Sequence, residues 1–214
     1  MTRGKILLLS VIMCCTIMVS AALADVNLPK PKITGGDGIF NLLQKRASGT
    51  RGEFPKGDVS IEDLSTILWA GTGLNRDGKG WTIPLAGGKP PYVKIYAVKR
   101  DGVFQYDWKA HSLIEISDKN VMGEITGDGF VKDSSCILVF VTDTADMGSM
   151  TNLNAGNSLA FTAAGAISQN IYLAADALGI STRYMVSMKA DAVKKELKLK
   201  EIDVPICIMP LGKR

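Results

Sequence analysis

The chain has 214 residues, of which 46% are apolar and 21% are charged. This size and composition allow one sizeable hydrophobic core, and they exclude a disordered chain, a collagen and a coiled coil. The formal net charge is +4, from 25 basic and 21 acidic side chains. Because Arg3 and Lys5 belong to a segment that we expect to be removed, the remaining charge is nearly balanced, and no nucleic-acid partner is predicted.

The first 24 residues have the three parts of a secretory signal peptide. Two basic residues precede an uncharged stretch over residues 6–19, and Ala22-Leu23-Ala24 supplies a small-x-small end before Asp25. We expect cleavage after Ala24 and an exported protein, periplasmic or secreted, with no stable membrane insertion. The alternative is an uncleaved membrane anchor, because residues 6–24 give 19 uncharged residues in a row, close to the ~20 that span a bilayer.

The cysteine and histidine content limits the chemistry of the mature chain. Cys14 and Cys15 leave with the signal, and Cys136 and Cys207 each lie in an apolar run. We expect both to be buried free thiols, with one disulfide between two strands as the alternative. With a single histidine, His111, and no metal-ligand spacing, the sequence argues against a histidine-rich metal site and a conventional Ser-His-Asp triad.

The first part of the mature chain combines loops with two predicted helices. Residues 25–38 contain two prolines and three glycines, which predicts an extended arm over the surface. Residues 39–46 favour a short amphipathic helix with a basic end, which suits the helix dipole, and a polar loop follows. Ser60 begins a capping box, and the apolar spacing after it predicts a helix that ends at Gly71 or Gly73.

The segment after that helix, residues 74–91, is a glycine- and proline-rich loop whose length suggests that it binds something. Residues 73–80 match the G-x-x-x-x-G-K part of a phosphate-binding P-loop. However, Gly80 stands where a Ser or Thr should bind magnesium, and a helix precedes the loop where a strand is required. We therefore predict no nucleoside triphosphate site, and the sequence gives no support for a Rossmann cofactor site either.

The rest of the chain mixes strands and helices. Residues 92–98 and 103–106 predict a hairpin with an Asp-Gly turn, and residues 135–142 predict a central strand buried on both faces. Residues 157–178 predict a helix that is apolar almost all round and is therefore expected to be buried. A strand, a helix and a last strand are expected at residues 182–186, 191–199 and 205–209. This order predicts one α+β domain over residues 39–214.

A stronger candidate site is the polar loop after the first predicted helix. Arg46 and Arg51, with Ser48 and Thr50 between them, supply bidentate cations and hydroxyl donors. Groups of this kind hold a phosphate. Taken alone, the loop also fits a solvated basic stretch at the surface.

Four stretches in chain order resemble the nitroreductase family of flavoproteins, and within it the short branch related to dehydrogenases of thiazolines and oxazolines. The family motif R-R-S-x-R-x-F is similar to residues 46–54, and the helix end L-L-W-A to residues 64–70. The turn G-[IL]-N-R-x-D-G resembles residues 73–78, and Y-x-Y-D-x-x-x-H-x-L resembles residues 104–113. The central helix of the family resembles residues 165–179.

The resemblance implies an FMN-binding α+β sandwich, in which helices flank a central antiparallel or mixed sheet and the long helix is buried at the core of a homodimer. It implies an oxidoreductase that transfers hydride through flavin N5 to or from a small conjugated or electrophilic substrate. The cofactor-binding residues implied in this way are Arg46 and Ser48 at the phosphate and ribityl chain, Arg51 at the pyrimidine edge, Pro84, Leu85, Ala86 and Gly88 at the ring, and Lys213 and Arg214 at the phosphate.

A second hypothesis stays open, namely a non-catalytic ligand-binding protein that keeps this scaffold and has lost tight flavin contact. Gly88 stands where the family has an asparagine that bonds the ring, and Val186 stands where a glycine is expected near N5. Export also separates the chain from soluble NAD(P)H.

The same resemblance places Asp107 and His111 just after the hairpin. We expect the two side chains to pair and to fix this corner structurally. Tyr106, Trp108 and Trp69 are expected to be core or dimer contacts and not substrate platforms.

Overall fold

A seven-stranded sheet, ordered β1-β6-β5-β4-β7-β9-β8, crosses the molecule in the computed structural model, which describes residues 24–54, 57–85, 90–142, 147 and 158–214. Every neighbouring pair of its strands is antiparallel. Its strands are β1 (Val26–Asn27), β4 (Val93–Lys99), β5 (Gly102–Asp107), β6 (Ser112–Ser117), β7 (Cys136–Thr142), β8 (Ile180–Thr182) and β9 (Val204–Lys213). The expected α+β class is confirmed, and the predicted central strand is β7, in which all residues are buried.

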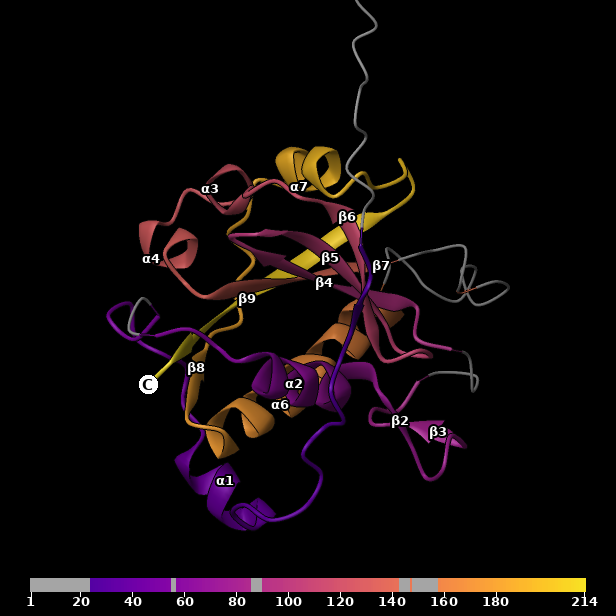
Figure 1. Cartoon of the computed structure of the whole chain (residues 1–214), viewed down its shortest axis with the longest axis vertical. Coiled ribbons are helices and arrows are strands. Elements are labelled where there is room, and N and C mark those ends of the chain that lie inside the picture. Colours follow the sequence, from indigo (N-terminus) through magenta and orange to yellow (C-terminus); the bar gives the residue numbers. More distant parts are fainter. Residues whose placement is uncertain (1–23, 55–56, 86–89, 143–146, 148–157) are drawn as a thin grey trace, which may run out of the picture.

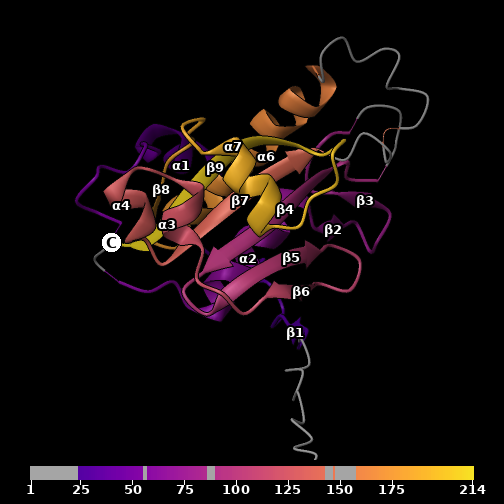
Figure 2. The ribbon, with the colours of Figure 1, turned by 90° about the horizontal axis from the view of Figure 1, so that it is seen from above.

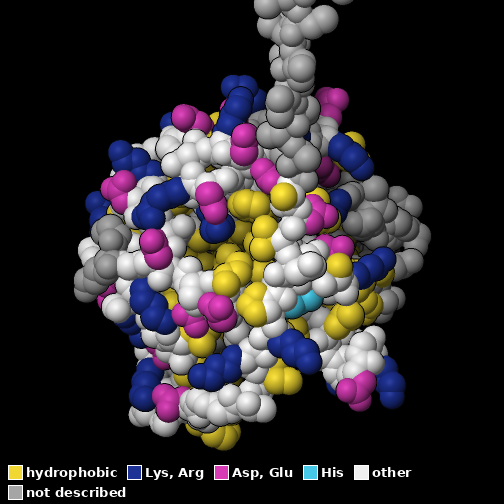
Figure 3. All heavy atoms as spheres, viewed as in Figure 1, with side chains coloured by type: hydrophobic (Ala, Val, Ile, Leu, Met, Phe, Trp, Pro, Cys, Tyr) yellow, Lys and Arg dark blue, Asp and Glu magenta, His cyan; other side chains and the backbone are white. Residues whose placement is uncertain are grey.

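Helices cover both faces of the sheet, so each face has its own apolar core. They are α1 (Ile39–Lys45), α2 (Ile61–Thr72), α3 (Met122–Ile125), α4 (Gly129–Lys132), α6 (Ser158–Ala177) and α7 (Ala190–Glu196). Figure 1 shows α2 and α6 on one face, with α3 and α7 on the other. Seen from above in Figure 2, α3 and α7 lie over the strands. On the face drawn in Figure 3, basic and acidic side chains are interspersed, as the nearly balanced charge suggests.

The predicted capped helix is α2, and its cap is the expected one. Ser60 Oγ accepts a hydrogen bond from Asp63 N at 3.1 Å. Gly71 lets α2 approach α6 and the sheet closely, because a Cβ there would lie 3.0 Å from Ile95 Cδ1 and 3.3 Å from Ile171 Cδ1. The predicted long helix is α6, but it is not buried on every side: the side chain of Phe161 is 46% exposed in the single subunit. The apolar, alanine-rich sequence of this helix did not show which of its faces the rest of the chain covers.

The segment expected to be one long loop, residues 74–91, contains a small hairpin, so this expectation was wrong. Strands β2 (Leu74–Asn75) and β3 (Gly80–Trp81) pair antiparallel. The turn between them places Arg76 and Asp77 at φ 49° and 56°, in the left-handed region. Trp69 on α2 anchors the start of this hairpin by donating its indole N–H to Leu74 O at 2.7 Å.

The two described cysteines are buried and free, as expected. Cys136 lies opposite Leu211, whereas Cys207 lies opposite Phe140, so the two residues occupy different rungs of the β7–β9 ladder. Burial raises the pKa of both thiols to about 12. Both therefore remain protonated and unreactive at neutral pH.

The N-terminal arm, residues 25–38, runs along the edge of the sheet and then over α2 (Figure 1). Strand β1 in this arm pairs with β6. His111 holds the next part of the arm: its Nε2 lies 3.1 Å from Pro29 O and 2.8 Å from Ser65 Oγ, and Leu28 N donates to the His111 carbonyl at 3.2 Å. Among the described residues, no helix is both long and apolar enough to cross a membrane.

The expected pairing of Asp107 with His111 was wrong, although the structural role of the corner was anticipated. The Asp107 carboxylate accepts the backbone N–H groups of Lys109 and Ala110 at 2.8 and 3.2 Å, which stabilises the turn. His111 Nδ1 instead lies 2.9 Å from the Tyr106 hydroxyl. The Asp107 carboxylate is thus held in the turn, and the Tyr106 hydroxyl is the partner of the imidazole.

The burial of His111 predicts how stability depends on pH. Burial lowers its pKa below the ordinary 6.5, against the raising effect of the Pro29 carbonyl. The unfolded chain therefore takes up a proton that the folded imidazole resists, and the free energy of unfolding falls as pH drops below about 6.5. Urea unfolding at several pH values should show that His111→Gln loses less stability than the wild-type protein over this window. Identical pH dependences would contradict the prediction.

Candidate functional site

The candidate site is built on the loop between α1 and α2, residues 46–54, which we call the basic loop. It packs against the end of the sheet formed by β8 and β9. Gly49 N donates to Thr182 O at 2.8 Å. Gly212 on β9 allows the closest approach, because a Cβ at this position would overlap the backbone of Phe54. The backbone of the loop thus rests directly on the C-terminal strand, where a larger residue than glycine would push it away.

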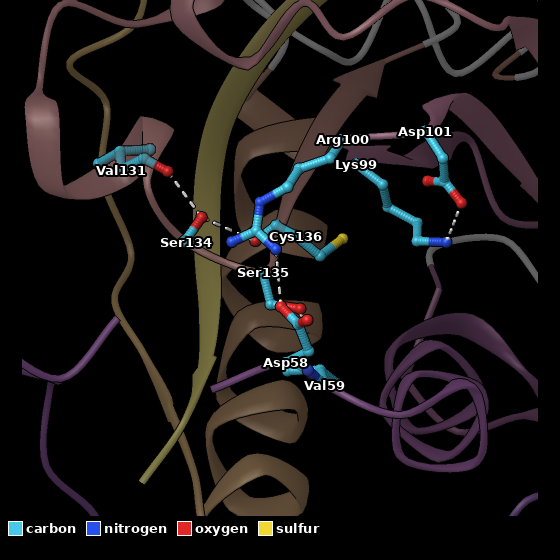
Figure 4. Close-up of polar contacts among 9 residues, drawn as sticks. All are labelled: Asp58, Val59, Lys99, Arg100, Asp101, Val131, Ser134, Ser135 and Cys136. Carbon is cyan, nitrogen blue, oxygen red and sulfur yellow. Dashed lines mark hydrogen bonds and ion pairs between the residues drawn. The ribbon is translucent and has the colours of Figure 1, made fainter. Parts of the chain in front are cut away.

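The chain leaving the basic loop is joined to the start of β7 and to the β4–β5 turn (Figure 4), at the same end of the sheet as Gly212. Asp58 Oδ1 pairs with Arg100 Nη1 at 2.8 Å, across to the β4–β5 turn. Val59 N donates to Ser135 Oγ at 2.8 Å. These contacts join the start of α2 to the sheet, so the basic loop is held on both sides.

Two of the predicted site residues, Arg46 and Ser48, converge on one side chain of α6. The guanidinium carbon of Arg46 lies 5.1 Å from the centre of the Tyr172 ring, within range of a cation–π contact. Ser48 Oγ lies 2.9 Å from the Tyr172 hydroxyl oxygen. Tyr172 itself is buried, whereas Ser48 is exposed. A cation and an accessible hydroxyl are therefore presented side by side.

Arg51 points to a different element. Its guanidinium carbon lies 5.5 Å from the centre of the Phe130 ring on α4, and Phe130 in turn contacts Phe54. The basic loop also carries an internal acid: Glu53 Oε2 accepts Thr50 N at 2.6 Å. The loop thus spreads its two arginines apart, one over α6 and one over α4.

The two basic residues at the C-terminus reach the surroundings of the basic loop, and each is paired with an acid. Lys213 Nζ lies 2.8 Å from Asp63 Oδ2 and donates to Leu178 O at 2.9 Å. Arg214 Nη1 lies 2.8 Å from Asp176 Oδ1. These ion pairs orient the cations and neutralise part of their charge. Arg214 Nε also donates to Ser181 Oγ at 3.3 Å, and within the described part of the chain the N–H donors on Nη2 are left for an anion.

The predicted ring-contact segment lies elsewhere. Asn170 Nδ2 donates to Thr82 O at 3.0 Å, which places the residues before Pro84 against α6. Asn170 and Tyr172 are two residues apart, or about 200° around a helix. Pro84 is exposed and Leu85 packs partly on the core, so this segment and Arg46 contact opposite sides of α6. Ala86 and Gly88 lie outside the described residues.

Sequence reasoning missed three residues of this site: Tyr172, Asp176 and Asp63. Tyr172 and Asp176 are one helical turn apart, so they share one face of α6. A tyrosine and an aspartate spaced by four in an alanine-rich helix gave a signal for such a face, but nothing in the sequence showed which segment would cover it. Asp63 was explained fully by its place in the capping box.

Together, these observations describe an α+β protein whose basic loop is a candidate site for an anionic ligand. The chain belongs to the nitroreductase family, whose family model matches residues 44–213. It is therefore an oxidoreductase of a flavin-dependent family, as the resemblance of the four stretches implied. A relative from Methanocaldococcus jannaschii, assigned as a nitroreductase, is 26% identical over 186 residues, which cover 82% of this chain and 91% of the relative.

Solved structures show the same fold. A protein from Ralstonia eutropha JMP134, assigned as a nitroreductase, is 27% identical with a TM-score of 0.80, over 88% of this chain and 89% of that one. The E. coli microcin synthetase McbBCD complex matches with 17% identity and a TM-score of 0.68, over 86% and 76%. A Desulfovibrio desulfuricans protein, assigned as a nitroreductase and solved with FMN, matches with 18% identity and a TM-score of 0.58, over 83% and 87%.

Proposed function

We propose that this chain is an exported oxidoreductase that binds FMN between the two subunits of a homodimer and acts on a small conjugated or electrophilic substrate. The observation that carries the proposal is the convergence of Arg46 and Ser48 on Tyr172, inside a chain of the nitroreductase family. A guanidinium beside an exposed hydroxyl is a donor set that suits a phosphate. FMN carries such a phosphate, and a distant relative of the same fold was solved with it.

The residues present fit FMN at its phosphate end. Arg46 and Ser48 would hold the phosphate, and Arg214 would approach it from the C-terminus, held by Asp176. Lys213, bound to both Asp63 and the Leu178 carbonyl, would contribute mainly by its charge. The role of these residues is to bind and orient, since the acids beside them are already occupied by cations.

FMN, when bound, supplies hydride chemistry at N5 that no side chain of this site could supply. Arg51 would place a positive charge near the pyrimidine edge, where negative charge collects on reduction. In this arrangement the protein would contribute orientation and electrostatic stabilisation more than a general acid or base. The likeness to the microcin synthetase complex supports the thiazoline and oxazoline dehydrogenase branch, with an azoline-like ring as one substrate of the proposed class.

The dimer is supported by the apolar side chains that a single subunit leaves exposed. On α1, Phe40 is 84% exposed and Ile39 and Leu43 are each 51% exposed, and α1 packs beside α6. Phe161 adds an exposed ring on α6. Because Asn170 and Tyr172 point to opposite sides of α6, the segment at Pro84 and Arg46 face away from each other within one subunit. A second copy would bring its own segment at Pro84 to the first copy's basic loop.

A non-catalytic binding protein remains the alternative outcome of the flavin experiments. Val186 is exposed on the loop after β8, where a side chain would crowd the approach to a flavin. This alternative predicts that a phosphate-bearing ligand binds near Arg46 without redox turnover.

The first prediction concerns the flavin phosphate. We expect the purified protein to bind FMN and to show flavin absorbance, and Arg46→Ala to weaken FMN binding by about 1.5 to 3 kcal/mol, the range for a charge-assisted hydrogen bond. Riboflavin, which lacks the phosphate, should bind both proteins equally in a fluorescence titration. Lys119→Ala, at an exposed position after β6, is the control for general surface charge. An unchanged FMN dissociation constant in Arg46→Ala would contradict the assignment.

The second prediction concerns assembly. Sedimentation equilibrium should give the mass of a dimer, and Phe40→Asp should shift it toward the monomer, because a charge on the apolar face of α1 opposes burial. Ile202→Asp is the matched control: Ile202 is also exposed, at 51%, but lies between α7 and β9 on the opposite side of the sheet. A monomeric wild-type protein, or equal effects of both variants, would overturn the proposed dimer.

The third prediction concerns export. Expressed with its own N-terminus in a bacterial host, the chain should be recovered outside the cytoplasm with a mass that begins at Asp25. Replacing Ala24 by a large residue should leave the precursor uncut, since the processing site needs small residues. A full-length chain retained at the membrane would instead support the uncleaved anchor.

A further inference from the structure

The side chain of Tyr172 contacts both Arg46 and Ser48. It lies on α6, 124 residues along the chain from Ser48, and its side chain is almost fully buried. Its hydroxyl oxygen also accepts the backbone N–H of Tyr184 at 2.7 Å. A buried tyrosine thus connects the two predicted phosphate ligands to the loop that follows β8.

These contacts give the hydroxyl a direction. The backbone N–H of Tyr184 can only donate, so Tyr172 Oη accepts from it. Among the described residues, the other hydrogen-bond partner of this hydroxyl is Ser48 Oγ at 2.9 Å, and our inference assigns the Tyr172 proton to this contact. With this assignment Ser48 keeps its own proton, and because the side chain is exposed, this proton is available to a ligand. The Ser48 hydroxyl can then donate a hydrogen bond to a ligand, and an anion needs such a donor.

The ring of Tyr172 acts on the second ligand. Arg46 stacks over it at 5.1 Å, which limits the rotamers of a long side chain and keeps its planar fork near Ser48. Asp176, one turn further along the same face of α6, holds Arg214 in turn. One face of α6 therefore orients two cations, Arg46 through Tyr172 and Arg214 through Asp176.

We infer that Tyr172 is a positioning residue for the phosphate group of the ligand: its hydroxyl polarises and orients Ser48, and its ring orients Arg46. The inference rests on the proposed binding of FMN at the basic loop. It assigns Tyr172 no contact with the flavin and no part in hydride transfer. Its effect should consequently appear with ligands that carry the phosphate and be absent with those that lack it.

The test compares FMN with riboflavin in fluorescence titrations of the full mature chain. Tyr172→Phe keeps the ring under Arg46 and removes the hydroxyl, so FMN affinity should fall about 3- to 10-fold, the worth of one hydrogen bond, while riboflavin affinity stays within about 2-fold. Tyr172→Leu also removes the stacking surface and should cost about 2- to 5-fold more for FMN. Tyr106→Phe removes a different buried hydroxyl and should change neither ligand.

A double-mutant cycle separates positioning from general packing. Ser48→Ala alters an exposed side chain and should lower FMN affinity about as much as Tyr172→Phe does, again without affecting riboflavin. In the Ser48→Ala background, Tyr172→Phe should have less than about a 2-fold further effect, because both substitutions break the same contact. Fully additive effects, or equal losses for FMN and riboflavin, would overturn the positioning role. Wild-type protein that binds neither flavin would overturn the proposed function itself.

Discussion

The packing of α6 against α2 and the sheet is the constraint on which the rest of the molecule depends. Because Gly71 has no side chain, α2 comes close to Ile167 and Ile171 of α6 and to Ile95 of the sheet at the same point. A helix held on this side has its rotation fixed, and the placement of every other α6 side chain follows from it. Tyr172 then faces the basic loop, while Asn170 faces the hairpin segment on the opposite side.

A second constraint places the two basic residues at the C-terminus, because each of them pairs with an acidic residue on a helix. Lys213 is held by Asp63 of α2, and Arg214 by Asp176 of α6. Both pairs are partly exposed, so their contribution to stability is small, but they decide where the charges lie. The proposed anionic ligand would meet cations already in position, which lowers the ordering cost of binding.

Local features of the sequence predicted much of the fold. The capping residue Ser60, the β-branched run of β7 and the turn signal between β4 and β5 each indicated their elements, because short-range sterics and hydrogen bonds decide them. The turn itself consists of Arg100 and Asp101, and the predicted turn residue Gly102 already pairs with Lys99. The hairpin at residues 74–81 and the partner of His111 were predicted wrongly. The hairpin depends on a contact with Trp69 of α2, and the partner of His111 is the Tyr106 hydroxyl while the Asp107 carboxylate bonds its own turn.

The sequence by itself determined which residues could bind an anion and that the chain resembles a flavin-binding family, because motif chemistry is written in consecutive positions. Tertiary structure alone decided that Ser48 meets Tyr172 and that Asp63 meets Lys213, across separations of 124 and 150 residues. Such partners depend on how helices rotate and how closely backbones approach. Those quantities are fixed by packing over the whole core, and no local pattern contains them.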